Sequence, residues 1–164
     1  MGFIVDLKKC AELAAKNEWV STQVDIDAGY GRECTAAVKA LIASAEGKVW
    51  STSAWRRGKK VVGNNIMPGT AIATFPIKNG KTGEFRFKGH AAILVEYYGK
   101  DIVVYDQWKP NPAIINDTGN PFSKRKISPK CDDYVSNDAE AFFVIELVEE
   151  PSGEPALCGK TSNY

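Results

Sequence analysis

The feature that most constrains the fold is a change of pattern along the chain. The first 47 residues show helical periodicity, and short apolar segments of strand length follow them. Residues 6–16 are predicted to form a helix, because their apolar side chains would share one face and Asp6 could cap the helix. A second helix is expected from about 32 to 45, where an apolar stripe begins at Cys34. A short helix or turn is expected at 53–57, and strands at 69–75, 85–87, 91–98, 102–108, 122–127 and 141–148. Helices that precede antiparallel strands predict one α+β domain over residues 1–164, with the N-terminal helices packed on the sheet.

The charge of the chain is close to balance, with 21 lysines and arginines against 20 aspartates and glutamates. This balance argues against a nucleic-acid or acidic-membrane partner. Two short basic clusters, Arg56–Lys60 and Lys124–Lys126, are expected to be solvated surface. No apolar run approaches the length that spans a bilayer. Charged residues interrupt the first twenty positions, so we expect either action without classical export or a chain that begins after a removed signal peptide.

Cysteine–histidine chemistry has one candidate base in this chain, because His90 is its only histidine. His90 stands at the start of an expected strand, and Cys34 stands at the head of the second expected helix. The positive end of a helix dipole favours a thiolate over a thiol, and an imidazole can accept and return the proton. The sequence therefore predicts Cys34 as a nucleophile and His90 as its base, although either residue alone would also fit a structural role.

The strand after that of His90 offers a residue that can orient the imidazole. A tight turn at residues 99–101 brings the end of this strand beside the start of the His90 strand. Either Asp106 or Gln107 can then reach His90, but not both, because neighbouring strand residues face opposite sides. We favour Asp106, because a carboxylate stabilises an imidazolium more strongly than an amide does.

The other three cysteines are Cys10, Cys131 and Cys158, which allow at most one disulfide. A pair of Cys158 with Cys131 or with Cys10 would fix the C-terminal tail, and the sequence leaves both pairings open. No C-x-x-C spacing is present, so we expect neither a structural zinc cluster nor another cofactor.

Five motifs together resemble the NlpC-type and CHAP-type papain-like cysteine peptidases, a group that includes amidase effectors of type VI secretion. They are Gly31–Cys34, Trp55–Gly58, Gly69–Phe75, Gly89–Ile93 and Asp106–Trp108. The resemblance covers about residues 30–148, leaves 149–164 as a tail, and implies a papain-like NlpC-type fold. The sequence departs from the usual D-C-S-G at the nucleophile, where it reads Glu33-Cys-Thr-Ala36.

The resemblance implies a cysteine hydrolase that cleaves amide bonds in bacterial peptidoglycan peptides by acyl transfer. Cys34 would attack the carbonyl and its backbone N–H would hold the oxyanion, while His90 would move the protons and Asp106 would orient the ring. Three residues are expected near the substrate, with a place in the core as the alternative for both tryptophans: Tyr30, Trp55 and Trp108.

The resemblance also implies secretion, or delivery to the periplasm or the extracellular space, with an immunity protein as a partner. We expect a monomer. A protein-directed protease or acyltransferase with the same triad, and a non-catalytic binding module on this fold, remain alternatives. A metal site of Cys34, His90 and Asp106 is the weakest alternative, because three ligands without motif spacing rarely form one.

Overall fold

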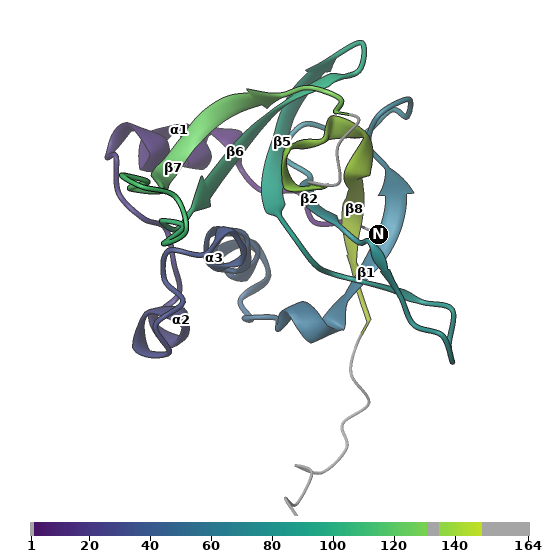
Figure 1. The fold of residues 1–164 in the computed structure, drawn as a ribbon, viewed down its shortest axis with the longest axis horizontal. Coiled ribbons are helices and arrows are strands. Elements are labelled where there is room, and N and C mark those ends of the chain that lie inside the picture. The colour runs from purple at the N-terminus through teal and green to yellow at the C-terminus, as the bar shows by residue number, and fades with distance from the viewer. Residues whose placement is uncertain (1, 131–134, 149–164) are drawn as a thin grey trace, which may run out of the picture.

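The computed structural model describes residues 2–130 and 135–148 (Figure 1). Its helices are α1 (Leu7–Ala15), α2 (Gln23–Asp27) and α3 (Cys34–Glu46), with short 3-10 turns η1 (Thr52–Ala54), η2 (Val135–Asn137) and η3 (Ala139–Ala141). Its strands are β1 (Trp55–Lys60), β2 (Ala71–Thr74), β3 (Ile77–Lys78), β4 (Phe85–Arg86), β5 (Ala91–Tyr98), β6 (Asp101–Trp108), β7 (Asn120–Ile127) and β8 (Phe142–Leu147).

Six of these strands form one sheet in the order β1-β8-β2-β5-β6-β7, and every neighbouring pair is antiparallel. The strands β3 and β4 pair separately as a small antiparallel ribbon. The three α-helices precede the strands in the chain, and α3 packs against β5 and β6 (Figure 1). The α+β architecture predicted from the sequence is therefore confirmed.

Local signals in the sequence set the ends of the two longer helices. The Asp6 carboxylate accepts a 2.8 Å hydrogen bond from the backbone N–H of Lys8 and so caps α1. The helix α3 ends at Gly47, whose φ of +72° is the left-handed conformation that favours glycine at this position. Both helices match their expected segments, whereas no helix was expected at the position of α2 between them.

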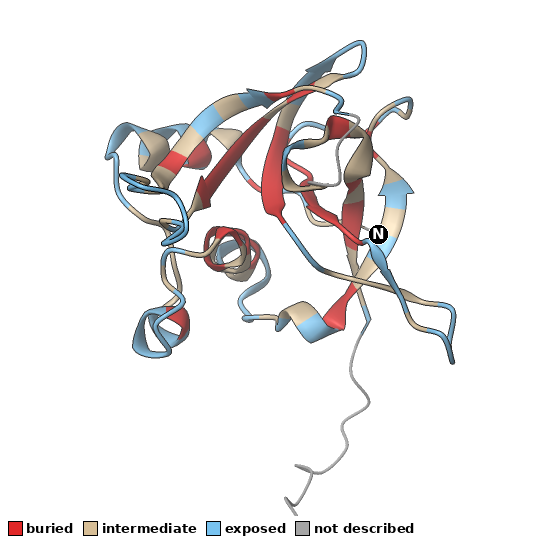
Figure 2. Cartoon of the chain, viewed as in Figure 1, coloured by how far each residue is buried: buried red, intermediate tan, exposed pale blue. Residues whose placement is uncertain are grey.

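The central sheet is buried on both faces (Figure 2). The helices cover one face, where a hydrophobic cluster joins Cys10 and residues of α3 to side chains of β2, β5 and β6. Loops and the turn η3 cover the other face, over a second cluster that includes Leu94, Val104 and Phe142. Strand positions therefore alternate between two apolar environments, and a polar side chain on either face needs a partner.

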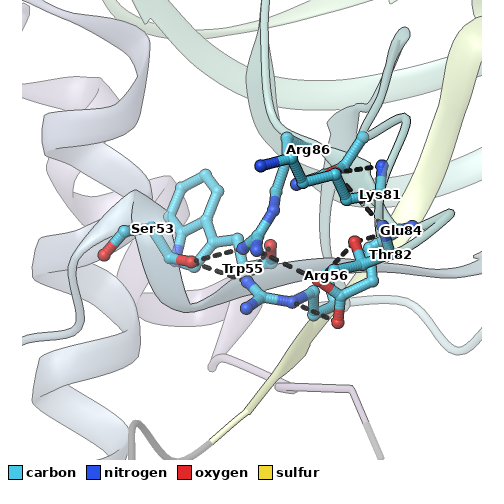
Figure 3. A network of polar contacts seen from close by, with 8 residues as sticks. Ser53, Trp55, Arg56, Lys81, Thr82, Glu84 and Arg86 are labelled. Carbon is cyan, nitrogen blue, oxygen red and sulfur yellow. Dashed lines mark hydrogen bonds and ion pairs between the residues drawn. The ribbon is translucent and has the colours of Figure 1, made fainter.

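The segment expected to be a short helix or turn at 53–57 is η1 followed by β1, which runs beside the β3–β4 ribbon. Figure 3 shows the polar network that joins them. Arg56 and Arg86 both contact the Glu84 carboxylate, with the closest atoms at 3.4 Å and 3.0 Å, and both donate to the carbonyl oxygen of Ser53. The basic cluster at Arg56 was expected to be solvated surface, but Arg56 instead holds the ribbon against the sheet.

The described part of the chain contains two free cysteines, Cys10 and Cys34. Cys10 lies on the buried face of α1, is fully buried and carries a free thiol. Cys131 and Cys158 lie outside the described residues. None of the helices in this part is both long enough and apolar enough to span a bilayer.

Candidate active site

Cys34 is the first residue of α3, at the end where backbone N–H groups lack helical partners. The preceding residue, Glu33, is the N-cap, but its side chain makes no capping hydrogen bond. The Glu33 carboxylate instead lies 2.5 Å from the ammonium of Lys109. Cys34 is 7% exposed, and its Sγ lies 3.9 Å from the carbonyl oxygen of Gly89. The helix therefore presents its positive end to a largely buried sulfur.

His90 lies directly before β5, and the neighbouring strand β2 fixes its backbone. The N–H of His90 donates to Oγ1 of Thr74 at 3.0 Å, and the N–H of Thr74 donates to the carbonyl of His90 at the same distance. Gly89 has a φ of +105°, and a Cβ atom there would lie only 2.7 Å from Thr74 Oγ1. Glycine at this position therefore permits the tight approach that anchors His90.

The imidazole of His90 contacts the carboxylate of Asp106, with 2.7 Å between Nε2 and Oδ2. Both residues are buried, at 5% and 1% exposure. The β5–β6 register pairs Ile93 with Tyr105, which brings the residue before β5 beside the end of β6. Because Nε2 faces Asp106, Nδ1 is the ring nitrogen that is left to exchange a proton with Cys34.

The surroundings of His90 favour its charged form. Burial has the largest single influence on the pKa of His90 and lowers it, but the hydrogen bonds of the imidazole to Asp106 and Cys34, and the negative charges of these two groups, raise it. Together they raise the pKa of His90 from the ordinary 6.5 to about 9. The imidazolium is therefore the stable form at neutral pH, as a thiolate–imidazolium pair requires.

Gln107 faces the opposite side of β6 and does not contact His90. Its amide exchanges two hydrogen bonds of 2.9 Å with the backbone of Val20, and donates to the carbonyls of Gly31 at 3.3 Å and Glu33 at 2.9 Å. Gln107 therefore holds the segment that leads into Cys34. Of the two alternatives for the contact with His90, the structure places Asp106 there.

Arg125 completes the cluster, although it was expected to be part of the solvated surface. Its Nε donates to Oδ2 of Asp106 at 2.7 Å, and its Nη1 donates to Asn137 Oδ1 at 3.0 Å. The β6–β7 register pairs Val104 with Arg125, which puts Arg125 and Asp106 on the same face. Arg125 lies two positions before Ile127, which is buried, and this spacing was the available signal for its position. The pairing of β7 with β6, however, could not be read from the sequence.

A cavity of about 530 Å³ opens at Cys34 and His90, and its other lining residues include Glu33, Trp108, Lys109, Arg125 and Asn137. A second cavity of about 330 Å³ also borders Cys34, and Tyr30 and Phe87 lie in its wall. A third, of about 620 Å³, shares Glu33 and Lys109 with the first and adds the apolar side chains of Trp19 and Ile26. The thiol therefore lies where two cavities meet.

The three residues expected near the substrate have different positions. Trp108 lines the first cavity, and the guanidinium of Arg125 lies over its ring at 5.0 Å from the centroid. Tyr30 is exposed and borders the second cavity. Trp55 is fully buried in an edge-on contact with Phe87, so its placement in the groove is wrong. The reason is that Trp55 begins a strand, whose alternation turns the indole into the core.

The described residues contain no group of three or more histidine, cysteine, aspartate and glutamate side chains that could hold a metal ion. The cluster at Cys34 contains instead a thiol, an imidazole, a carboxylate and a guanidinium. These groups in contact suit proton transfer and nucleophilic attack.

Comparison with known proteins gives one family and one solved structure. The family model of domesticated amidase effector 2 matches residues 3–145, a range that includes Cys34, His90 and Asp106. The solved structure is described as type 6 secretion amidase effector 2 (Tae2); it is 29% identical, covers 82% of this chain and 91% of its own, and superimposes with a TM-score of 0.49. None of the curated proteins compared with the chain matches it. Because the family model spans most of its length, the chain belongs to the domesticated amidase effector 2 family, which confirms the amidase predicted from its sequence.

Proposed function

We propose that this chain hydrolyses amide bonds in the peptides of bacterial peptidoglycan, with Cys34 as nucleophile, His90 as general base and acid, and Asp106 as the residue that orients the imidazole. The observation that carries the proposal is the contact between the only histidine and a buried carboxylate, beside a thiol at an uncapped helix N-terminus. Family membership supports the amidase class, and the site supports cysteine chemistry within that class.

The reaction begins from the thiolate–imidazolium pair of Cys34 and His90, in which Nδ1 of His90 already holds the proton of the thiol. The thiolate attacks the carbonyl carbon of the scissile amide, and a tetrahedral oxyanion forms. The imidazolium then gives its proton to the leaving nitrogen, the C–N bond breaks, and a thioester on Cys34 remains. Next, His90 takes a proton from a water molecule that attacks the thioester. Collapse of the second oxyanion releases the carboxylic acid and the thiolate.

The head of α3 is suited to hold the oxyanion of both steps. The side chain of Glu33 points to Lys109 and does not cap the first turn, where the N–H of Ala36 donates to the carbonyl oxygen of Glu33. An N–H of Cys34 or of its neighbour can then donate to negative charge that develops next to the sulfur. The helix dipole favours the same charge, and its effect is largest within this first turn.

The cavities on both sides of the thiol support a polymeric substrate. Cys34 borders the cavity that contains His90 and also the cavity that contains Tyr30, so groups on both sides of the scissile bond have room. We retain Trp108 and Tyr30 as substrate-binding residues on these two sides. A chain of cell-wall peptide would cross the sulfur from one cavity to the other.

The cell-wall substrate and the family together support a papain-like NlpC-type enzyme that is secreted or delivered to the periplasm. Cys34, His90 and Asp106 meet within a single copy of the chain, so the proposed chemistry needs no second copy and a monomeric enzyme suffices. An immunity protein that inhibits this enzyme would need to cover the cavity at Cys34 and His90.

Mass spectrometry of purified peptidoglycan digested by the full chain tests the proposal. We expect the wild-type protein to release muropeptides with newly formed carboxyl and amino ends, and Cys34→Ala to release none while keeping the fold by circular dichroism. Lys124→Met, at an exposed position of β7, is the matched control and should behave as wild type. Equal release by a folded Cys34→Ala protein would overturn the proposal.

A further inference from the structure

Oδ2 of Asp106 receives hydrogen bonds from two side chains. His90 contacts it through Nε2 and Arg125 donates through Nε, each at 2.7 Å. The other oxygen, Oδ1, is buried and has no partner among the described residues. The Nη2 atom of Arg125 lies 3.5 Å from Nε2 of His90, so the guanidinium also faces the imidazole.

The guanidinium of Arg125 is fixed on three sides. Besides its contact with Asp106, Nη1 donates to Asn137 at 3.0 Å, and the ring of Trp108 lies under the group at 5.0 Å. A guanidinium remains charged over the working range of any enzyme. Arg125 therefore adds a permanent positive charge beside the imidazole, held in one orientation.

The charges that face His90 come from three elements: Cys34 from α3, Asp106 from β6 and Arg125 from β7. In the free enzyme the thiolate and Asp106 supply two negative charges against one positive charge, and the net negative charge favours an imidazolium. In the thioester intermediate the sulfur is neutral. The charges of Asp106 and Arg125 then cancel, and burial favours the neutral imidazole that must accept a proton from water.

We propose that Arg125 is a positioning residue that cancels the charge of Asp106 in the thioester intermediate and so allows His90 to act as the base for hydrolysis. Without Arg125, Asp106 would hold the proton on the imidazole in both halves of the reaction. Arg125 thus lets one histidine be charged when the thiolate is present and neutral when it is not. This role depends on the proposed function, in which Cys34 forms a thioester.

The charge effect can be measured without activity, because the chain has one histidine and its ring resonances need no assignment. Cys34→Ala reproduces the loss of the thiolate, and NMR titration then reports the pKa of His90. We expect Arg125→Gln in this background to raise that pKa by about one unit or more, since a cation within about 4 Å is lost. Glutamine can still donate to Asp106, and Arg125→Met, without any donor, should give a shift of the same sign.

Two controls separate local charge from net charge and from geometry. Lys124→Met removes one positive charge from the neighbouring position of β7, and should leave the pKa of His90 unchanged. Arg125→Lys keeps the charge, and should hold that pKa within about 0.3 units of the parent. An unchanged pKa in a folded Arg125→Gln or Arg125→Met protein would overturn the inference, even if the chain is an amidase.

The kinetic test uses the chain with its thiol intact. At pH 7 we expect Arg125→Gln to lower kcat about tenfold, to lower kcat/KM less, and to accumulate the Cys34 acyl-enzyme, which intact-mass measurement detects. Raising the pH should restore kcat, because the imidazole then loses its proton. A fall of kcat/KM as large as that of kcat, with no acyl-enzyme and no recovery at high pH, would contradict the inference.

Discussion

Gln107 donates a 2.9 Å hydrogen bond to the carbonyl oxygen of Glu33, the residue directly before Cys34. The preceding strand residue, Asp106, turns to the other face of β6 and contacts His90. One dipeptide of β6 therefore serves both halves of the site, because successive strand residues face opposite sides. Substitutions of the two residues are expected to have different effects, in one case on stability and in the other on turnover.

Gln107→Ala is expected to lower the free energy of unfolding by about 3 kcal/mol. The substitution leaves a backbone N–H and a carbonyl of Val20 without partners, and removes donors to Gly31 and Glu33, in a region where Gln107 is fully buried. Urea denaturation followed by fluorescence measures the loss. A variant as stable as the wild type would contradict the structural role of Gln107.

Asp106→Asn is expected to lower kcat about a hundredfold or more while the protein stays folded. The asparagine keeps the size of the side chain but removes the charge that stabilises the imidazolium, and Arg125 then stands uncompensated beside the ring. Both changes lower the pKa of His90. Kinetics on a defined muropeptide, with the His90 pKa from NMR, test this; unchanged kcat together with an unchanged pKa would contradict it.

The stability of the protein is expected to fall as the pH rises from about 6.5 to about 9. The pKa of His90 is about 9 in the folded chain against an ordinary 6.5, so the folded state holds the proton more tightly than the unfolded state. The resulting stabilisation is complete below about 6.5 and is lost as the pH passes the folded value. Urea denaturation across this range measures it.

The matched control for this pH dependence is His90→Gln, which has no imidazole to titrate. Its free energy of unfolding should change less between pH 6.5 and 9 than that of the wild type, so the difference between the two proteins isolates His90. Parallel pH curves for the two would show that His90 does not hold its proton in the folded state.

Most of the fold could be predicted from the sequence because its signals are local. Asp6 marks the start of α1 and Gly47 the end of α3, and the tight turn at 99–101 sets the β5–β6 hairpin. The segment at 53–57 was misjudged, because its alternation is short and the residues that make it a strand, those of β8, lie about ninety positions later in the chain.

The candidate site likewise has one part that local signals predict and another that depends on strand pairing between distant residues. The contact of His90 with Asp106 follows from one hairpin, so the sequence could place it. The position of Arg125 depends on β7 pairing with β6 after a long proline-containing loop, and no local pattern reports that pairing. The burial of Trp55 was missed for a related reason, because it requires the position of β1 in the sheet.

The two described cysteines are expected to differ sharply in reactivity. Burial is the main cause that raises the pKa of the Cys10 thiol to about 11, and Asp6 adds to it, so Cys10 stays protonated at neutral pH. Cys34 borders a cavity, beside His90 and the helix N-terminus. Iodoacetamide at pH 6 should therefore modify Cys34 in the folded chain and leave Cys10 intact, as peptide mass mapping can show. In His90→Gln the modification of Cys34 should slow at least tenfold, because the thiolate loses its imidazolium partner. Equal labelling of Cys10 and Cys34 in the folded protein, or labelling of Cys34 that does not depend on His90, would mean that the sulfur and the imidazole do not act as a pair.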